Sequence, residues 1–205
     1  MTEKEKMLAG KLYDASDAEL SALRRAAHAL CLRYNQLSEE NTQERREILE
    51  RLAPNHGNGF YIQGPIAMDY GCFTMFGDGF YANFNLTILD CAPVEIGKNV
   101  MLGPNVSLLT PMHPLCWSER NPTRGKDGAF HSLEYAKPIK IGDNCWIAGN
   151  VTICGGTVIG SGCVIGAGSV VTRSIPDGYL AAGNPCRPIR PITEDDLMGI
   201  DGRNR

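Results

Sequence analysis

The sequence predicts an all-β main domain, a parallel β-helix, behind a small α-helical N-terminal segment. Two observations predict this fold. Aliphatic residues recur every six positions, at Ile141, Ile147, Ile153, Ile159, Ile165 and Val171. Glycine content changes along the chain, because residues 1–52 hold one of the 23 glycines and residues 53–205 hold the other 22. A period of six fits neither a helix nor a single strand, but it fits a coil of three short strands whose aliphatic residues stack along one axis.

Residues 1–56 are predicted to form the helical N-terminal segment. An apolar stripe with steps of three and four residues runs from Leu20 to Tyr34, and Asp17 precedes it in the position of an N-cap. A second helix is expected over Thr42–Leu52. Two helices this polar do not fold alone, so they should pack on the β-helix or cover a substrate.

The β-helix is predicted over residues 57–190, with a C-terminal tail over 191–205. The six-residue register also holds around Ile96, but the 45 positions from Ile96 to Ile141 are not a multiple of six. A segment of about 110–137, which contains proline, glycine and polar residues, must therefore leave the coil as one protruding loop. Insertions in solenoids gather on the binding face. A disordered bulge is the alternative.

Composition argues against several classes of function. A net charge of −3 and a pI near 5.8 give no basic surface for nucleic acid. No apolar run reaches the roughly 18 residues of a membrane span, and the charged N-terminus is unlike a secretory signal. Eight cysteines without a CxxC pair, in a chain long enough to build a core, indicate reduced thiols and a cytoplasmic protein. A disulfide framework is the alternative.

Four motifs carry a resemblance to a known family. They are Ala9–Tyr13 in the helical segment, the stretch Tyr81–Ile88, the pair His113–Pro114 and the ending Ala181–Arg187. Over about residues 3–192, the sequence resembles the maltose/galactoside O-acetyltransferase family of hexapeptide-repeat acyltransferases. The resemblance implies a left-handed β-helix and a homotrimer with sites between subunits. It also implies transfer of an acetyl group from acetyl-CoA to a sugar hydroxyl, with no metal required.

The resemblance places the catalytic chemistry on His113 and Asn83. A sugar hydroxyl is a poor nucleophile, and histidine is the usual base for its proton because it titrates near neutral pH. A solvated loop histidine is the interpretation that applies without the resemblance. The side-chain amide of Asn83 can stabilise a tetrahedral oxyanion; its alternative is a corner asparagine of the β-helix. Glu134 is expected to orient His113 or to hold the sugar.

The resemblance also names the residues expected to contact the acceptor. They are Asp17, Arg24, Asp69, Tyr81, Asp90 and Glu134. Asp14 competes with Asp17, because the spacing does not settle which one matches the family. Galactoside-type enzymes commonly have serine at the position of Asp69, and two consecutive carboxylates where this chain has Asp90 and Cys91. The identity of the sugar therefore stays open.

A third group of residues is expected to bind coenzyme A by the same resemblance. They are Trp146, Gly149, Ala167, Thr172, Arg173, Arg187 and Arg190. Gly149 and Ala167 leave backbone groups free to pair with the pantetheine amides. Arg187 and Arg190 suit the phosphates through forked, charge-assisted hydrogen bonds, and a solvated C-terminal arm is the alternative. Trp146 either flanks the thioester tunnel or is an ordinary packing residue.

Other functions stay open from the sequence. The acceptor could be a specific oligosaccharide, as for the nodulation acetyltransferases, or an antibiotic. Zinc-dependent hydratases use the same scaffold, although only His113 and His131 fall near each other here. A solenoid without catalytic function is not favoured, because it would have no need for Asn83, His113 and Arg187. A rival reaction route, in which Cys116 takes the acetyl group first, is less favoured than direct attack because no residue matched to the family is a cysteine.

Overall fold

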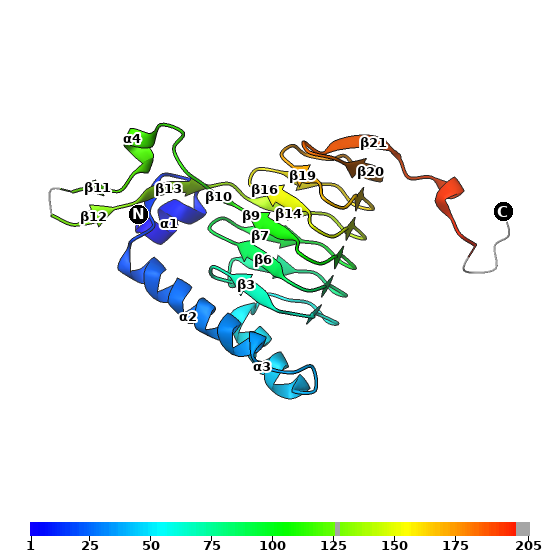
Figure 1. Ribbon diagram of the computed structural model, residues 1–205, viewed down its shortest axis with the longest axis horizontal. Helices are drawn as coiled ribbons and strands as arrows, with labels where there is room; N and C mark the ends of the chain where they lie inside the picture. Colours follow the sequence, from blue (N-terminus) through cyan, green and yellow to red (C-terminus); the bar gives the residue numbers. More distant parts are fainter. Residues whose placement is uncertain (126–127, 200–205) are drawn as a thin grey trace.

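The computed structural model describes residues 1–125 and 128–199. Most of the chain winds into a β-helix with three flat walls of parallel strands (Figure 1). The seven-stranded wall contains β2 (Tyr61–Ile62), β5 (Tyr81–Ala82), β8 (Met101–Leu102), β15 (Trp146–Ile147), β18 (Val164–Ile165), β20 (Tyr179–Ala182) and the antiparallel β21 (Arg187–Pro191). The five-stranded wall contains β3 (Ile66–Met68), β6 (Leu86–Leu89), β9 (Ser107–Leu109), β16 (Thr152–Cys154) and β19 (Val170–Val171). The four-stranded wall contains β4 (Thr74–Phe76), β7 (Val94–Ile96), β14 (Ile139–Ile141) and β17 (Val158–Ile159).

The predicted aliphatic ladder forms the axis of the β-helix. Its six members, from Ile141 to Val171, are each at most 1% exposed. Ile141 pairs with Ile159, so a coil here is three hexapeptides long. The compact residues four positions after the aliphatic ones are buried as well: Cys145, Val151, Thr157, Cys163 and Ser169. Each coil therefore stacks its apolar side chains on those of its neighbours, and the predicted inward frame is confirmed.

The earlier coils are longer than the sequence period predicts. Met68 pairs with Ile88 and Ile88 with Leu108, so each of these coils exceeds three hexapeptides by two positions. The extra length lies where the chain passes from the five-stranded to the four-stranded wall, at residues 69–73 and then 90–93. We call this edge the insertion corner, because the insertion leaves the coil from the same edge one turn later.

The insertion is a folded loop in its described part, not a disordered bulge. Ile96 pairs directly with Ile141, so the whole insertion leaves and rejoins the β-helix within a single coil. It holds β10 (Pro111–Met112), α4 (Trp117–Arg120), β11 (Thr123–Arg124), β12 (Phe130–His131) and β13 (Leu133–Ala136). β11 and β12 form a hairpin, and β13 lies between β10 and β1 (Tyr13–Asp14). One antiparallel sheet thus joins the N-terminal segment to the loop (Figure 1).

The N-terminal segment contains three helices, α1 (Glu3–Leu8), α2 (Ala18–Asn35) and α3 (Thr42–Leu52). The two predicted helices are confirmed, and Asp17 is the N-cap of α2. α1 is a third helix, which the sequence did not predict. Residues 9–13, expected in a helix, form a turn and the start of β1 instead. The reason lies at Gly10, whose φ of +66° is in the left-handed region and ends the helical path.

α2 and α3 close the N-terminal end of the β-helix. Tyr34 on α2 and Leu49 and Leu52 on α3 belong to the same buried cluster as Ile62 and Met68 of the first coil. Figure 1 shows both helices running beneath that coil. An uncapped solenoid would expose its core and a row of unpaired strand groups, and terminal caps prevent this.

Composition predicted reduced cysteines and no membrane-spanning segment. All eight cysteines are free, so the chain forms no disulfide framework. Over residues 1–125 and 128–199, no helix combines the length and the apolar character that crossing a membrane requires. The last part of the predicted C-terminal tail, residues 200–205, lies outside the described residues.

Candidate functional site

Several predicted acceptor and catalytic residues gather at the insertion corner. Arg24 reaches it from α2, Asp69 lies in the first lengthened turn, and His113 and Glu134 come from the insertion. These segments stack at one edge of the β-helix, so side chains up to 121 positions apart in the sequence make contact there. The contacts form two groups, one around Asp69 and one around His113.

Asp69 lies among donors on the side of α2. Nε2 of His28 is 3.4 Å from Oδ1 of Asp69, and the thiol of Cys91 donates to Oδ2 at 3.6 Å. Arg24 donates to the hydroxyl of Tyr70 at 3.0 Å. A hollow of about 390 Å³ opens beside Asp69, between α2 and the five-stranded wall. A carboxylate with hydrogen-bond donors beside it suits a ligand that carries several hydroxyl groups.

His113 faces a carboxylate that is itself held in place. The imidazole is half-exposed, and its Nε2 is 3.7 Å from Oε2 of Glu134. The hydroxyl of Tyr13 donates to the other carboxylate oxygen, Oε1, at 2.9 Å. Tyr13 is buried in the same apolar cluster as Cys91, whose thiol donates to Asp69, so the two groups share one buried layer. An accessible imidazole beside a fixed carboxylate can accept a proton, because the negative charge stabilises the imidazolium.

Asp14 and Asp17 both serve local structure. Asp17 caps α2, whereas Oδ2 of Asp14 is 2.5 Å from Nδ1 of His131 in the insertion. Burial favours a higher pKa for Asp14, but hydrogen bonds from Ser16, His131 and Ser132 outweigh it and hold the pKa below its ordinary value. Of the two carboxylates, only Asp14 interacts with the insertion, through β1.

The structure corrects the expectation for Asp90. The side chain has no exposed surface. Its oxygens accept four hydrogen bonds, at 2.9–3.2 Å, from the N–H groups of Tyr70, Gly71 and Phe73 and from the hydroxyl of Thr74. Burial raises its pKa, although these hydrogen bonds oppose the rise. Asp90 cannot touch an acceptor and instead fixes the turn that presents Asp69. The neighbouring Cys91 is the residue that reaches Asp69, and the lengthened coil spacing is the sequence signal that marks this turn.

Asn83, Tyr81 and Trp146 lie on or next to the seven-stranded wall. Tyr81 and Trp146 belong to β5 and β15, and the ring of Tyr81 stacks on that of Tyr61 with centroids 6.0 Å apart. Asn83 follows β5, and its Oδ1 accepts from the N–H of the next residue at 2.7 Å. Among the residues that the structure describes, no hydrogen bond or ring contact joins these three side chains to His113. A single chain does not bring the two predicted catalytic residues together.

The predicted donor-binding residues of the coils occupy two different corners. Gly149 and Ala167 lie between the seven-stranded and five-stranded walls, one coil apart. A Cβ added at Gly149 would lie 3.3 Å from Pro104 of the preceding coil, so a side chain there would crowd the corner. Thr172 and Arg173 follow β19 at the insertion corner and are exposed.

The two C-terminal arginines lie on β21 and are exposed. Nη1 of Arg187 donates to the carbonyl of Cys186 at 2.8 Å. Arg190 forms a forked ion pair with Asp196, at 2.6 and 2.8 Å, and this pairing holds the pKa of Asp196 well below its usual range. A phosphate at Arg190 must therefore displace Asp196 or share the guanidinium with it.

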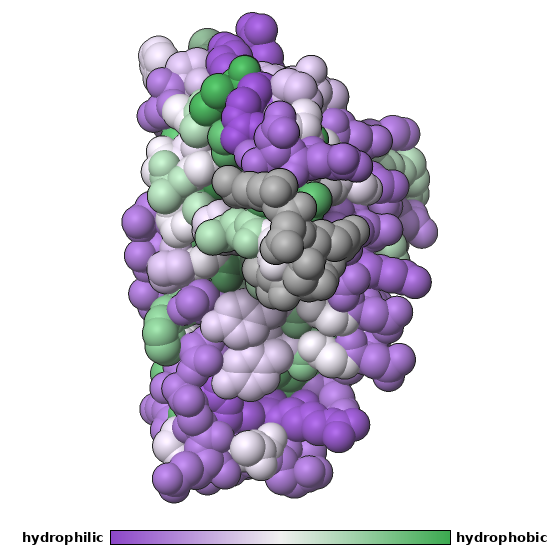
Figure 2. Space-filling model, turned by 90° about the vertical axis from the view of Figure 1, so that its right-hand side faces the viewer, coloured by the Kyte–Doolittle hydropathy of each residue, from purple (hydrophilic) through white to green (hydrophobic). Residues whose placement is uncertain are grey.

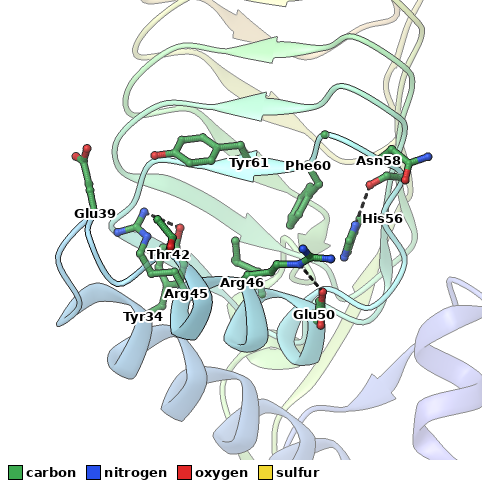
Figure 3. A pocket seen from close by; sticks show the side chains of 13 residues that line it. Tyr34, Glu39, Thr42, Arg45, Arg46, Glu50, His56, Asn58, Phe60 and Tyr61 are labelled. Atoms are coloured by element: carbon green, nitrogen blue, oxygen red, sulfur yellow. Dashed lines mark hydrogen bonds and ion pairs between the residues drawn. The ribbon is translucent and has the colours of Figure 1, made fainter.

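A separate cavity of about 440 Å³ lies between α3 and the first coil (Figure 3). Phe60 points from the coil toward α3, where Arg46 donates to Glu50 at 2.9 Å. None of the predicted site residues lines this cavity. Within the described residues, no group of three His, Cys, Asp or Glu side chains is placed to hold a metal ion.

Two segments of the chain match family descriptions. Residues 6–56 match the maltose acetyltransferase hexapeptide capping motif, and residues 138–173 match six bacterial transferase hexapeptide repeats. The chain is also 37% identical over 192 residues to the galactoside O-acetyltransferase of Escherichia coli, a match that covers 94% of this chain and 90% of that protein. The chain belongs to the maltose/galactoside O-acetyltransferase family.

Solved structures of this O-acetyltransferase family share the fold. A maltose O-acetyltransferase from Clostridium difficile matches with a TM-score of 0.83 and 44% identity, covering 95% of this chain and 99% of that one. A galactoside acetyltransferase in complex with coenzyme A matches with a TM-score of 0.87 and 37% identity, covering 96% of this chain and 94% of that one. The fold is thus a left-handed parallel β-helix, and the protein is an acetyltransferase of the hexapeptide-repeat class.

Proposed function

We propose that this acetyltransferase moves an acetyl group from acetyl-CoA to a hydroxyl of a sugar, with His113 as the general base. The observation that supports it most is the network at the insertion corner. At one end of the network His113 faces the held carboxylate of Glu134, and at the other end Asp69 lines a hollow. The coenzyme A in a family structure supports the donor. Maltose, glucose and galactosides are the acceptors that the family relationship suggests.

The proposed reaction is a direct transfer. His113 takes the proton of the sugar hydroxyl while the hydroxyl oxygen attacks the thioester carbonyl. Asn83 donates to the oxyanion that forms, and Glu134 stabilises the imidazolium. The C–S bond then breaks, and His113 returns the proton to the departing thiolate. The products are a sugar ester and free coenzyme A.

The remaining predicted residues divide between the two substrates. Arg24 and Asp69 would bind sugar hydroxyls, because a guanidinium donates and a carboxylate accepts. We assign Asp14 rather than Asp17 to the acceptor side, since Asp14 contacts the insertion. For the donor, we propose the backbone of Gly149 and Ala167 for the pantetheine amides, with the remaining donor-site residues at the phosphates and the thioester: Trp146, Thr172, Arg173, Arg187 and Arg190.

We further propose a homotrimer with each site between two subunits. The seven-stranded wall carries an outward column of mostly apolar side chains: Tyr61, Tyr81, Met101, Trp146, Val164 and Leu180. On the side of the molecule shown in Figure 2, pale and green residues lie between hydrophilic ones. A contiguous apolar surface marks an interface more often than free solvent contact. Packing this wall against the insertion corner of a second copy would bring Asn83 to His113 around a closed threefold axis.

An acceptor screen tests the proposed activity. Purified protein, acetyl-CoA and one candidate sugar are mixed, and thiol release is followed for maltose, glucose, galactosides and chitin oligomers. We expect sugar-dependent release with a mono- or disaccharide. A strong preference for chitin oligomers would favour the specific-oligosaccharide alternative, and no release with any sugar would contradict the proposal.

A substitution of His113 tests the base. His113→Ala should lower kcat by roughly 10²- to 10⁴-fold and leave coenzyme A affinity nearly unchanged, because only the proton transfer is lost. His56→Ala is the matched control, since His56 lines the cavity of Figure 3, away from the network. A His113→Ala enzyme with the kcat of the wild type would overturn the assignment.

A further inference from the structure

We propose that Tyr13 is a positioning residue of this site, which holds Glu134 against His113. The inference rests on the proposed function. The hydroxyl of Tyr13 donates to Glu134 and not to His113, so its effect on catalysis would pass through Glu134.

The geometry around Glu134 carries the argument. Tyr13 is 1% exposed, and its hydroxyl donates to Oε1 of Glu134 at 2.9 Å. The other oxygen of Glu134, Oε2, faces His113 and lies 3.7 Å from its Nε2. The backbones of Tyr13 and Glu134 are directly paired between β1 and β13, so the ring and the carboxylate start from one register position. A carboxylate held at one oxygen has lost most of its rotational freedom, and its second oxygen is directed by the first.

Tyr13 and Cys91 are both neutral donors. Burial raises the pKa of the Tyr13 hydroxyl and of the Cys91 thiol, so both groups keep their protons at physiological pH. The hydroxyl of Tyr13 donates a hydrogen bond to Glu134 at 2.9 Å, and the thiol of Cys91 donates to Asp69 at 3.6 Å. The two donors belong to the same buried cluster. Two carboxylates, one at the base and one at the acceptor hollow, thus each accept from an uncharged side chain of the same buried cluster.

A double-mutant cycle tests whether Tyr13 acts through Glu134. Tyr13→Phe keeps the buried ring and removes only the donor. We expect kcat to fall on the order of ten- to hundredfold, because small displacements of a catalytic group cost that much, while KM for acetyl-CoA stays unchanged. In a Glu134→Ala background, Tyr13→Phe should cause no further loss.

Two further variants make the result specific. Tyr34→Phe is the matched control, because Tyr34 is equally buried and its hydroxyl donates to the carbonyl of Ile62 at the other end of α2; its kcat should equal that of the wild type. Glu134→Asp keeps the charge but shortens the side chain, so it should reproduce the loss even if Tyr13→Phe does not fold. Wild-type kcat in Tyr13→Phe or in Glu134→Asp would overturn the proposal. Losses that multiply in the double mutant would overturn it too.

An unfolding experiment separates this proposal from the proposed function. Urea unfolding of the same cycle measures the Tyr13–Glu134 hydrogen bond without any substrate. We expect a coupling of roughly tenfold in the unfolding equilibrium constant, as for a hydrogen bond to a charged group. If no sugar is acetylated but this coupling is present, the proposed function fails while the contact stands. If transfer is seen but the coupling is absent, the inference about Tyr13 fails alone.

Discussion

At the scale of single residues, the candidate site depends on side chains that meet no substrate. Asp90 accepts hydrogen bonds from three backbone N–H groups and a hydroxyl, and so gives residues 69–74 one defined turn. Four donors around one side chain suit an ionised carboxylate, which only accepts. That turn fixes where Asp69 stands beside the hollow. The position of Asp69 in the site therefore depends on the buried side chain of Asp90.

The Asp14–His131 contact predicts how stability depends on pH. Hydrogen bonds hold the folded pKa of Asp14 below the value of about 3.9 expected in the unfolded chain. Asp14 therefore stabilises the folded state above about pH 4, and this stabilisation is lost as the pH falls through the folded pKa of Asp14. Thermal unfolding between pH 6 and 2.5 should show a shallower acid loss for Asp14→Asn than for the wild type. Asp195→Asn, in the exposed C-terminal segment, is the control; a curve for Asp14→Asn parallel to the wild type would contradict the expectation.

Cys116 tests the direct route against an acetyl-enzyme. Its thiol is exposed, three residues from His113, and hydrogen bonds with Ser118 lower its pKa. The thiol nevertheless lies outside the network that joins His113 to Asp69, so we expect Cys116→Ala to keep a kcat close to that of the wild type. Mass spectrometry of the enzyme mixed with acetyl-CoA alone should show no acetyl adduct. An adduct on Cys116 that forms and discharges at the turnover rate would establish a double displacement.

Part of the site could be predicted from the sequence. The family resemblance named His113, Asp69 and Arg24, and the position of Glu134 late in the loop suggested that it orients His113; the structure brings all four to one corner. Tyr13 was not predictable, because its partner is 121 positions away and a single buried hydrogen bond leaves no periodic trace. The contact between Cys91 and Asp69 was not predictable for the same reason.

At the scale of elements, the aliphatic ladder sets the stability of the coils. Ile153 in β16 is fully buried and pairs with Leu108 and Val171 of the neighbouring coils. Ile153→Asp would place an unpaired charge in the axis, at a cost of at least several kcal/mol. Urea unfolding should show no folded protein, or a large loss of stability. Thr152→Asp, the neighbouring position facing outward, should stay folded; a fully active Ile153→Asp protein would mean that the inward frame is wrong.

The period explains why some elements were predictable and others were not. Between Ile141 and Val171 every coil is three hexapeptides long, so the spacing alone defines the core. Upstream, the longer turns at 69–73 and 90–93 each shift the frame by two positions, so the six-residue steps do not continue from one coil to the next. α1 has only six residues and depends on its capping box rather than on an apolar stripe.

At the scale of the whole molecule, the apolar column on the seven-stranded wall predicts the assembly. Met101 on the seven-stranded wall is 52% exposed, and Met75 on the four-stranded wall is 51% exposed. If the seven-stranded wall is the interface, Met101→Asp should dissociate the trimer, whereas Met75→Asp should not. Light scattering should report three times the chain mass of 22.3 kDa for the wild type and for Met75→Asp. If the wild type has the mass of one chain at working concentration, the proposed trimer is wrong.

The insertion begins and ends at adjacent points of the coil. The N–H of Lys137 donates to the carbonyl of Thr110 at 3.0 Å, and Pro111 pairs with Ala136. Closing a loop between two such points costs only about 0.6 kcal/mol more for each doubling of its length. The length and sequence of the insertion can therefore vary while the strands of the β-helix keep their register. Under the proposed function, substitutions in this one surface segment would change which hydroxyl reaches His113, while the β-helix keeps its fold.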